Sequence, residues 1–296
     1  MNITVLYNPG AGRGRAREKI DDVLGNFRDL GATVEVATSV SPEHLTELAR
    51  EASRNGGARV VVCGGDGSLN LTLRELDLGN ATVGIVPLGS GDDFAQALGI
   101  PRETRAACEV VLRGRVREVD IAVVNGRRFA GVAGLGFDSQ VARVANGVRR
   151  LRGSLVYLYS IFRVLPRFKP HRVMVEIDGE RREEDLMFVV VGNSPRYGGG
   201  IHIAPAAVLD DGKLDMMIVR RSSILNLLTT LPMAYRGTHV KRPYVITERG
   251  TSFRFESAES LEIFADGECV GETPATIGLA SQRLKILVPH GAAHRS

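Results

Sequence analysis

The sequence has only three cysteines in 296 residues, and their arrangement excludes two kinds of crosslinked architecture. Cys63, Cys108 and Cys269 are odd in number, lie far apart and form no CxxC pair. A disulfide framework uses paired cysteines, and a zinc ribbon uses closely spaced CxxC ligands. The length corresponds to about two domains, which can bury cores of their own without such crosslinks.

Long hydrophobic runs are also missing. No stretch approaches the roughly eighteen unbroken apolar residues of a membrane-spanning helix. The segment Met1–Tyr7 is typical of a strand, not of a charged and then apolar leader. Hydrophobic residues make up 44% of the chain and charged residues 24%, ordinary values for a globular protein. We therefore expect a soluble, cytoplasmic protein.

Acidic residues are absent from one continuous stretch, although the chain as a whole is only mildly basic. No Asp or Glu lies between Asp138 and Glu176, and the basic residues there give a local charge of +8. Because the formal charge of the whole chain is +4, the remainder carries −4. The basic residues of the stretch are Arg143, Arg149, Arg150, Arg152, Arg163, Arg167, Lys169 and Arg172.

Several nucleotide-binding and hydrolase motifs are absent as well. The chain has five lysines, and its single Gly-Lys pair, Gly212-Lys213, is followed by leucine, so it contains no P-loop. Gly10-Ala11-Gly12-Arg13-Gly14 has its third glycine one residue too early for a dinucleotide fingerprint, although Glu35 lies near the position of a ribose-binding acid. Neither HExxH nor GxSxG occurs.

The first third of the chain alternates short apolar strands with amphipathic helices. The strands are apolar without alternation, as in a parallel sheet covered on both faces, and glycine-rich turns follow them where open α/β sheets bind ligands. We predict an α/β nucleotide-binding domain over residues 1–120. Its strands are predicted at Ile3–Tyr7, Thr33–Val36, Val60–Val62 and Thr82–Val86, and its first helices over Arg15–Leu30 and after Ser41-Pro42.

From about Val119 the pattern changes to hairpins. Asn125-Gly126 and Asp178-Gly179 are typical hairpin turns between β-rich runs. Helical stretches around Ser139–Leu165 and Ile224–Tyr235 interrupt this pattern. We predict an antiparallel β-sandwich-like domain over residues 121–296.

The strongest local motif follows the third predicted strand and is Gly64-Gly65-Asp66-Gly67-Ser68-Leu69-Asn70. Its glycines let the backbone approach a ligand closely, and the helix that follows adds its positive N-terminal end. A carboxylate in such a loop repels phosphate unless it handles a metal, a hydroxyl or a hydrogen-bond network. A tight turn is the alternative, but it seldom needs three glycines around one carboxylate. The motif favours a phosphate-binding loop.

Further carboxylates stand at strand ends or turns, at Asp93, Asp120, Asp211 and Asp266-Gly267-Glu268. An Asp-Gly pair alone is most often a simple turn. Together with the glycine-rich loops, however, these carboxylates can supply a general base and a magnesium site.

Six ordered blocks span nearly the whole chain, and together they resemble one family. They are Asn8–Gly12, Gly64–Ser68, Pro87–Ala95, Gly134–Asp138, Tyr197–Gly200 with Pro205-Ala206 and Asp211-Gly212, and Asp266–Glu268. NAD kinases and phosphofructokinases share the GGDG motif alone, whereas the ordered set resembles the diacylglycerol kinase catalytic family, which includes bacterial soluble lipid kinases and the sphingosine kinases. The resemblance implies an NAD-kinase-like α/β domain, a β-sandwich domain, and final residues that pack back on the first domain.

The resemblance also implies a function, an ATP-dependent and magnesium-dependent transfer of phosphate to a lipid hydroxyl such as that of diacylglycerol. ATP would bind in the cleft between the domains. Asp266 matches the family's proton acceptor, Glu268 its companion acid, and Asp66 belongs to the same catalytic set. The implied nucleotide contacts are Asn8, Thr38, Gly64, Gly65, Asp66, Gly67, Ser68, Leu69, Asn70, Ser90 and Asp93.

The magnesium ion implied by the family would be held by the Asp211 side chain and by the carbonyls of Val208 and Lys213. A carboxylate network of Asp66, Asp93 and Asp120 would reach toward it. Phosphoryl transfer needs positioning and charge neutralisation more than covalent chemistry, which suits such a set.

The chain departs from the family pattern at four positions. Ser68 and Ser90 stand where threonine is usual and keep a hydroxyl. Asp92 stands where asparagine is common and brings a negative charge near the expected phosphates, and Leu71 stands where many members have glutamate.

The basic stretch contains a candidate membrane contact. Leu151–Pro166 places Leu151, Leu155, Leu158, Tyr159, Phe162 and Leu165 on one helical stripe. Basic residues beside apolar ones suit an anionic membrane surface, at about 1 kcal/mol for each basic residue, although the same stripe can pack onto the β domain. We expect peripheral membrane contact through residues 143–172, which gives access to a lipid substrate presented by the membrane. No nucleic-acid recognition module is visible, and a homodimer stays open.

Two other functions stay open. An NAD kinase would share Gly64–Gly67, but the sequence shows no second Gly-Ser-Thr-Ala-Tyr-like block. A non-catalytic lipid- or nucleotide-binding protein is the other alternative, motivated by Asp92 and Leu71. The identity of the lipid and the preference among nucleoside triphosphates are left undetermined.

Overall fold

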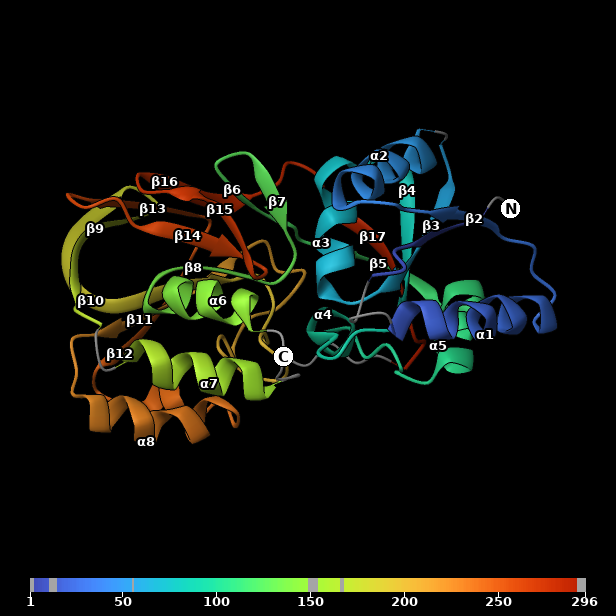
Figure 1. Cartoon of the computed structure of the whole chain (residues 1–296). Helices are drawn as coiled ribbons and strands as arrows, with labels where there is room; N and C mark the ends of the chain where they lie inside the picture. Colours follow the sequence, from blue (N-terminus) through green and yellow to red (C-terminus); the bar gives the residue numbers. More distant parts are fainter. Residues whose placement is uncertain (1–2, 11–14, 55, 149–153, 166–167, 292–296) are drawn as a thin grey trace. The chain divides into compact units, whose positions relative to one another are not determined.

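A computed structural model describes residues 3–10, 15–54, 56–148, 154–165 and 168–291. The chain forms two compact units. Unit 1 comprises Met1–Ile121 together with Ser281–Ser296, and unit 2 comprises Ala122–Ala280. Figure 1 shows the elements of both units, and each unit has its own sheet.

Unit 1 is built on a mostly parallel sheet, as its unbroken apolar strands predict. Among the described residues its strand order is β2-β1-β3-β4-β17-β5. All neighbouring pairs are parallel except β17 with β5, so the C-terminal strand of the chain completes the N-terminal sheet. The strands are β1 Ile3–Tyr7, β2 Glu35–Thr38, β3 Ala58–Gly64, β4 Ala81–Pro87, β5 Arg115–Val119 and β17 Leu284–Val288.

Helices cover both faces of this sheet (Figure 1). They are α1 Arg15–Asp29, α2 Pro42–Ser53, α3 Asp66–Glu75, α4 Asp93–Ala97 and α5 Thr104–Arg113. Helix α1 buries Val23 and Phe27 against β1, β3 and α5, whereas α2 packs beside α3. Helix α2 begins as its Ser-Pro signal predicts, because the Ser41 hydroxyl accepts a hydrogen bond from the N–H of His44 and Pro42 is the first helical residue.

Unit 2 is built on an antiparallel sheet, and the predicted fold class is thereby confirmed. Its strand order is β15-β14-β8-β10-β9-β13-β16-β6-β7 within the described residues, while β11 pairs with β10 and with β12. The strands are β6 Ala122–Val124, β7 Arg127–Phe129, β8 Val132–Gly136, β9 His171–Ile177, β10 Glu180–Gly192, β11 Leu214–Arg220, β12 Val245–Gly250, β13 Ser252–Ser257, β14 Glu262–Ala265, β15 Glu268–Glu272 and β16 Ala275–Leu279.

The long strand β10 lets this sheet curve around one apolar core. Its first half pairs with β9 and its second half pairs with β8, with a register irregularity between Leu186 and Phe188 on the side facing β11. The core between the curved parts contains the fully buried rings of Phe129, Phe253 and Phe255.

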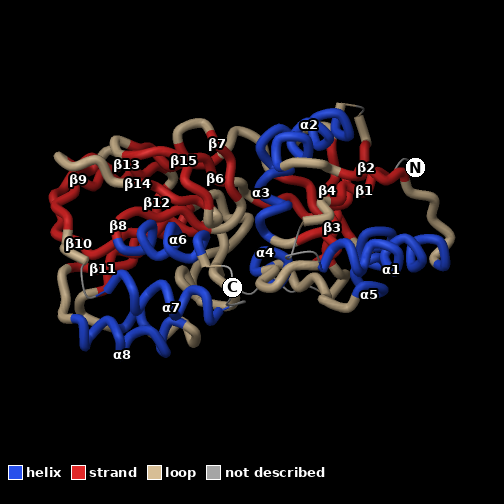
Figure 2. The backbone as a smooth tube through the Cα atoms, in the orientation of Figure 1, coloured by secondary structure: helices blue, strands red, loops and turns tan. Residues whose placement is uncertain are grey.

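Three helices pack on one another and on sheet residues at one side of unit 2 (Figure 2). They are α6 Phe137–Gly147, α7 Ser154–Val164 and α8 Ile224–Ala234. The helical stretch predicted around Ser139–Leu165 is thus two helices, and residues 149–153 between them lie outside the described part. Phe137, Val141 and Val164 form a small core there. No helix in the described ranges is both long enough and apolar enough to cross a membrane.

Candidate functional site

Two glycine-rich loops meet at the carboxyl ends of the neighbouring strands β3 and β4 in unit 1. Gly64 ends β3 opposite Pro87, which ends β4, and the N–H of Leu88 donates to the Gly64 carbonyl at 2.9 Å. A Cβ atom added to Gly89 would lie 2.7 Å from the Cα of Gly65, closer than real Cβ contacts come. Glycine is therefore needed at these positions for backbone-to-backbone contact, which brings both loops to one place.

Asp66 connects the two loops. It is the first residue of α3, and its carboxylate accepts hydrogen bonds from the N–H groups of Asp93 at 3.0 Å and Phe94 at 3.1 Å. These are the first two residues of α4, so the side chain satisfies donors that a helix N-terminus otherwise leaves unpaired. The network that a carboxylate in this loop was expected to make is present, and it is a helix cap. Its catalytic role stays a prediction.

Asp92 is buried between the same loops. Its backbone is left-handed, with φ of 52°, and its Oδ1 accepts a hydrogen bond from the N–H of Gly89 at 3.0 Å. The pKa of Asp92 is raised to about 6, mainly by burial and also by the charge of Asp66, while the Gly89 hydrogen bond and Arg102 act in the opposite direction. The negative charge that Asp92 brings in place of asparagine is therefore partly offset, because this carboxyl takes up a proton more readily than an exposed carboxyl does.

Some of the other predicted nucleotide contacts are exposed, whereas others are buried or have N–H groups that already donate hydrogen bonds within the chain. Thr38, Gly67 and Ser90 are exposed at strand or loop ends. The side chains of Ser68, Leu69 and Asn70 are buried in unit 1. The N–H groups of Ser68 and Leu69 already donate to the Gly65 carbonyl. The first turn of α3, from Gly65 to Gly67, is therefore the part of this loop best placed to offer N–H groups to an anion.

Asn8 and Asp120 have partners within unit 1. Asn8 follows β1, and its Oδ1 accepts a hydrogen bond from the N–H of Gly10 at 2.9 Å. The buried Asp120 accepts one from Nε of Arg283 at 2.8 Å, which joins the end of β5 to the start of β17. Asp66 and Asp93 are thus joined by a direct hydrogen bond, whereas Asp120 is held by an arginine. Within the described ranges no three His, Cys, Asp or Glu side chains are grouped as a metal site would require.

Asp266 lies in the β14–β15 turn of unit 2, and backbone N–H groups fix its orientation. Its carboxylate accepts hydrogen bonds from Ala130 at 2.9 Å, Gly131 at 3.0 Å and Val132 at 2.9 Å, and its backbone is left-handed with φ of 47°. A Cβ atom on Gly131 would clash with this carboxylate. The side chain is therefore preorganised by the β7–β8 connection, as a positioned proton acceptor must be.

Side chains from outside the β14–β15 turn donate hydrogen bonds to backbone carbonyls in and after it. The side-chain amide of Asn146, on α6, donates to the Gly267 carbonyl at 2.7 Å. Glu268, the predicted companion acid, begins β15 directly after the turn. Arg127 donates to the carbonyl of Cys269, which follows it.

Asp211, the predicted magnesium ligand, is paired with an arginine. Its Oδ2 contacts Nη2 of Arg249 on β12, and its Oδ1 accepts a hydrogen bond from the backbone N–H of Lys213 at 3.0 Å. Both carboxylate oxygens are thus engaged, and the Arg249 guanidinium lies beside the side chain predicted to hold the cation. In this arrangement the Asp211 side chain does not fit a magnesium ion, which would have to share Oδ2 with this guanidinium. The magnesium assignment stays a prediction that this arrangement does not favour.

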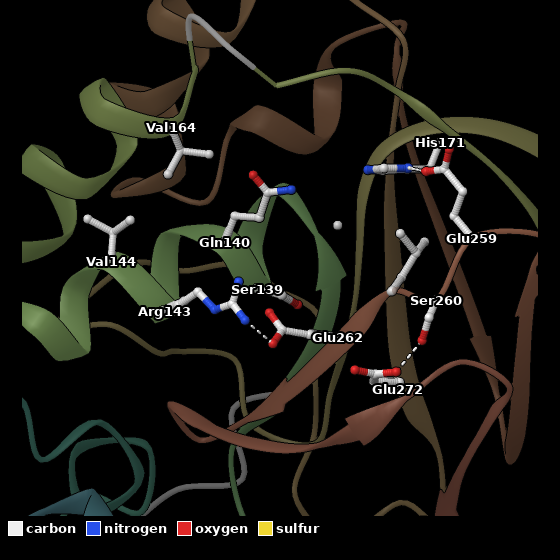
Figure 3. A pocket seen from close by; sticks show the side chains of 12 residues that line it. Ser139, Gln140, Arg143, Val144, Val164, His171, Glu259, Ser260, Glu262 and Glu272 are labelled. Carbon is white, nitrogen blue, oxygen red and sulfur yellow. Dashed lines mark hydrogen bonds and ion pairs between the residues drawn. The ribbon is translucent and has the colours of Figure 1, made fainter.

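Among the cavities that described residues of unit 2 line beside its helices, two differ in character. One, of about 90 Å³, is lined by apolar side chains of α6, α7, α8 and the sheet, including Phe137, Leu165 and Leu227. The other, of about 460 Å³, is polar (Figure 3). Figure 3 shows polar side chains pairing around it, as Arg143 with Glu262, His171 with Glu259 and Ser260 with Glu272.

Some basic residues of the acid-free stretch therefore lie next to acidic residues in the folded chain. Arg143 pairs with Glu262, and Arg172 lies 3.5 Å from Asp185 on the neighbouring strand. Arg163 and Lys169 are exposed. The remaining basic residues of the stretch, Arg149, Arg150, Arg152 and Arg167, lie outside the described residues.

Sequence reasoning missed the arginines that neutralise the predicted carboxylates. Arg249 is 38 residues from Asp211 in the sequence and Arg283 is 163 residues from Asp120. Arg102, whose guanidinium donates to the Ser90 and Gly91 carbonyls, was missed too. No spacing rule joins such pairs, because strand register and the return of β17 bring them together.

Comparison with known proteins gives a consistent result over the whole chain. Residues 2–124 match the diacylglycerol kinase catalytic domain, and residues 131–288 match the YegS C-terminal NAD kinase beta sandwich-like domain. The chain is 29% identical to a diacylglycerol kinase of Bacillus subtilis strain 168 over 295 residues, which covers 98% of this chain and 97% of the relative. It is 31% identical to a diacylglycerol kinase of Mycobacterium tuberculosis H37Rv over 297 residues, with 98% and 96% coverage.

A solved structure shares the fold. The crystal structure of a diacylglycerol kinase from Bacillus anthracis str. Sterne superposes with a TM-score of 0.74 at 20% sequence identity. The alignment covers 99% of this chain and 98% of that one. The family resemblance seen in the six sequence blocks is therefore confirmed.

Proposed function

The chain belongs to the diacylglycerol kinase family, and on that premise we propose that it transfers the γ-phosphate of ATP to the hydroxyl of a membrane lipid, diacylglycerol or a similar lipid alcohol. The observation that best supports nucleotide binding is the backbone contact between Gly65 and Gly89. Two glycine-rich loops at adjacent carboxyl ends of a parallel sheet, one of them leading into a helix N-terminus, form a surface of the kind that binds phosphate.

We assign Asp266 the role of proton acceptor in this reaction. The lipid hydroxyl oxygen would attack the γ-phosphorus, its proton would pass to the Asp266 carboxylate, and ADP would leave with the electrons of the broken phosphoanhydride bond. The three backbone N–H groups hold the carboxylate in one orientation, so little reorganisation is needed during transfer. Magnesium would enter as part of the Mg·ATP substrate.

A direct assay tests the reaction class. The protein is incubated with γ-labelled ATP and, in separate arms, diacylglycerol, a sphingoid base, a monoacylglycerol and NAD, with products identified by mass. Label in one lipid product agrees with the proposal, and label in NAD alone would replace it with the small-molecule kinase alternative. Binding of ATP and lipid without transfer in any arm would mean a non-catalytic binding protein.

Gly67 offers a sharp test of the nucleotide site. It is exposed in the first turn of α3, no atom lies within 4 Å of a Cβ built there, and it has no left-handed backbone. Gly67→Ala should therefore fold as well as the wild type, yet weaken ATP binding severalfold if phosphate approaches this backbone. Gly25→Ala, in α1 and equally uncrowded, is the matched control and should leave ATP binding unchanged. Unchanged ATP affinity in Gly67→Ala would argue against phosphate at this turn.

Asp266→Asn tests the proton acceptor, and the contacts predict a second effect. The amide replaces an oxygen that accepts backbone N–H groups, so both turnover and stability should fall, the latter by about 1–3 kcal/mol. Asn146→Ala removes the Gly267 contact from the same turn but leaves the carboxylate, and should retain transfer. Turnover at the wild-type rate in Asp266→Asn would refute the assignment.

We also propose that helices α7 and α8 contact the membrane that presents the lipid. Leu155 is 58% exposed and Phe162 53% exposed on α7, and Leu225 is 70% exposed at the start of α8. The two helices line one apolar cavity, so these side chains belong to neighbouring elements. The cavity volume of about 90 Å³ is too small for a whole acyl chain, so we place only contact with the bilayer surface here.

Vesicle binding tests this surface. Phe162→Ser and Leu225→Ser should each reduce co-sedimentation with vesicles that contain anionic lipid. Val40→Ser, in unit 1, removes an apolar side chain that is 87% exposed and serves as the control. Equal sedimentation of all variants would return α7 to a purely structural role.

A further inference from the structure

An arginine of β12 joins the loop that contains Asp211 to the neighbouring strands of unit 2. Arg249 lies on β12 directly opposite Asp215 on β11 in the antiparallel register. Its Nε lies 3.3 Å from Oδ1 of Asp215, and its Nη2 reaches past that residue to Oδ2 of Asp211. One guanidinium therefore serves two carboxylates, one on the strand and one on the loop that precedes it.

The guanidinium is a positive charge that the two carboxylates share. Asp215 is 7% exposed, and a buried carboxylate without a partner is costly, so Arg249 stabilises it in the folded chain. Asp211 is exposed, and its contact with the same guanidinium joins the loop to β12.

We propose that Arg249 supplies this cation in place of a divalent metal, and so holds the Asp211 loop in a metal-independent conformation. A planar guanidinium presents several N–H donors in a fixed fork and binds two carboxylates at once. A divalent ion at Asp211 would have to displace Nη2 and then lie next to the same positive charge. The proposal does not depend on the proposed function, because it concerns how the loop is held without nucleotide or lipid.

Hydrogen exchange of the loop, measured by mass spectrometry without nucleotide, tests the proposal. In the wild-type protein the peptide that covers residues 208–220 should exchange equally fast in excess magnesium chloride and in EDTA. In Arg249→Gln the same peptide should exchange severalfold faster in EDTA, because two carboxylates then repel each other. Added magnesium should slow it again in a saturable way, since a cation can now occupy the vacated position.

Arg254→Gln is the matched control. This arginine lies on β13 of the same sheet and pairs with Glu256, so the variant loses the same charge and a similar ion pair without touching Asp211. Its exchange over residues 208–220 should equal that of the wild type in both buffers. Arg249→Lys keeps one positive charge and should keep the loop insensitive to EDTA, which serves where Arg249→Gln does not fold.

Three results would overturn the proposal. They are slower exchange of the wild-type loop on adding magnesium alone, wild-type exchange of this peptide in Arg249→Gln, and equal EDTA sensitivity of the lysine and glutamine variants. A failure of this kind leaves the lipid kinase assay untouched, and a failure of that assay leaves the exchange experiment interpretable.

Discussion

Asp92 in unit 1 and Glu184 in unit 2 are buried to almost the same degree, with 4% and 5% of their surface exposed, yet their surroundings treat negative charge in opposite ways. Asp92 accepts a hydrogen bond from the backbone N–H of Gly89 and lies near the charges of Asp66 and Asp93. Glu184, on β10, accepts from Nε and Nη2 of Arg220 and from Nε of Arg182. Both side chains have little exposed surface, but Asp92 lies deeper in its unit, and the partners of the two carboxylates differ in charge.

The pKa shifts follow these partners. Burial raises the pKa of Asp92 to about 6. Hydrogen bonds from Arg220 lower the pKa of Glu184 in spite of its burial. In this pair the carboxylate beside formal positive charges keeps a low pKa, whereas the one backbone hydrogen bond to Asp92 does not offset its burial. Unit 2 pairs its buried carboxylate with arginines, which stabilises the fold. Unit 1 instead keeps excess negative charge at the loops to which we assign nucleotide binding.

The largest effect is expected from Asp92→Asn. The folded pKa of Asp92 lies above its unfolded value of 3.8, so the folded protein binds the extra proton and loses stability as the pH rises from about 4 to 6. At neutral pH this costs up to about 3 kcal/mol. Asparagine keeps the left-handed backbone and the acceptor for Gly89. Unfolding in denaturant should therefore show a more stable variant at pH 7, with the difference vanishing near pH 4.

Asp178→Asn is the control for that experiment. Asp178 also has a left-handed backbone, with φ of 48°, and accepts hydrogen bonds from the N–H groups of Thr251 and Ser252. The Thr251 side-chain hydrogen bond is the main cause that lowers the pKa of Asp178, so asparagine should reduce stability at neutral pH. Stabilisation by both substitutions would mean that the backbone, not the charge, governs Asp92.

Glu184→Gln is expected to lower the free energy of unfolding at neutral pH, a smaller effect than that of Asp92→Asn and opposite in sign. Its lowered pKa means that the ion pairs contribute stability above the unfolded value of 4.5 and lose it as the pH falls through the folded pKa. Because Arg182 and Arg220 are partly exposed and can be rehydrated, we expect a loss of about 2 kcal/mol at pH 7, less than for a fully buried pair. Thermal unfolding as a function of pH measures it.

The control lies on the same strand. Glu183→Gln removes an exposed carboxylate that lies 3.7 Å from Arg172, and such pairs contribute little. A loss as large as that of Glu184→Gln would show that the effect belongs to the net charge of the sheet and not to the buried network.

Local signals were enough to predict most of this fold. Unbroken apolar strands, glycine-rich turns and the Ser41-Pro42 cap predict the parallel sheet and its helices, and β1 has the predicted bounds. The second strand lies at Glu35–Thr38 rather than Thr33–Val36, because an exposed edge strand has little apolar pattern to mark its limits. Strands β5, β12, β15 and β16 were not predicted. Charged residues interrupt the first three, and β16 is a short run that contains Thr276 and Gly278.

The candidate site could be predicted only in part, for a physical reason. Glycines and carboxylates at strand ends are local, and Asp66, Asp93 and Asp266 were found in this way. The partners of Asp66 and Asp266 are the N–H groups of Phe94 and Val132, which are far away in the sequence and are brought near by the fold. A motif predicts which group is present, whereas its charge state depends on these tertiary neighbours.

The smallest effect, and the finest test of the comparison, is expected from Arg102→Gln. Arg102 is an exposed cation that lowers the pKa of Asp92, so its removal should move the pKa of that carboxyl further upward. Exposed charges are screened by water and salt, which keeps the change small. Carboxyl NMR of Asp92 during a pH titration measures it directly. If the pKa of Asp92 in the variant equals that in the wild type, burial and the neighbouring acids alone set the charge of this carboxyl. A cation would then act on a buried carboxylate only through direct contact, as the arginines do on Glu184.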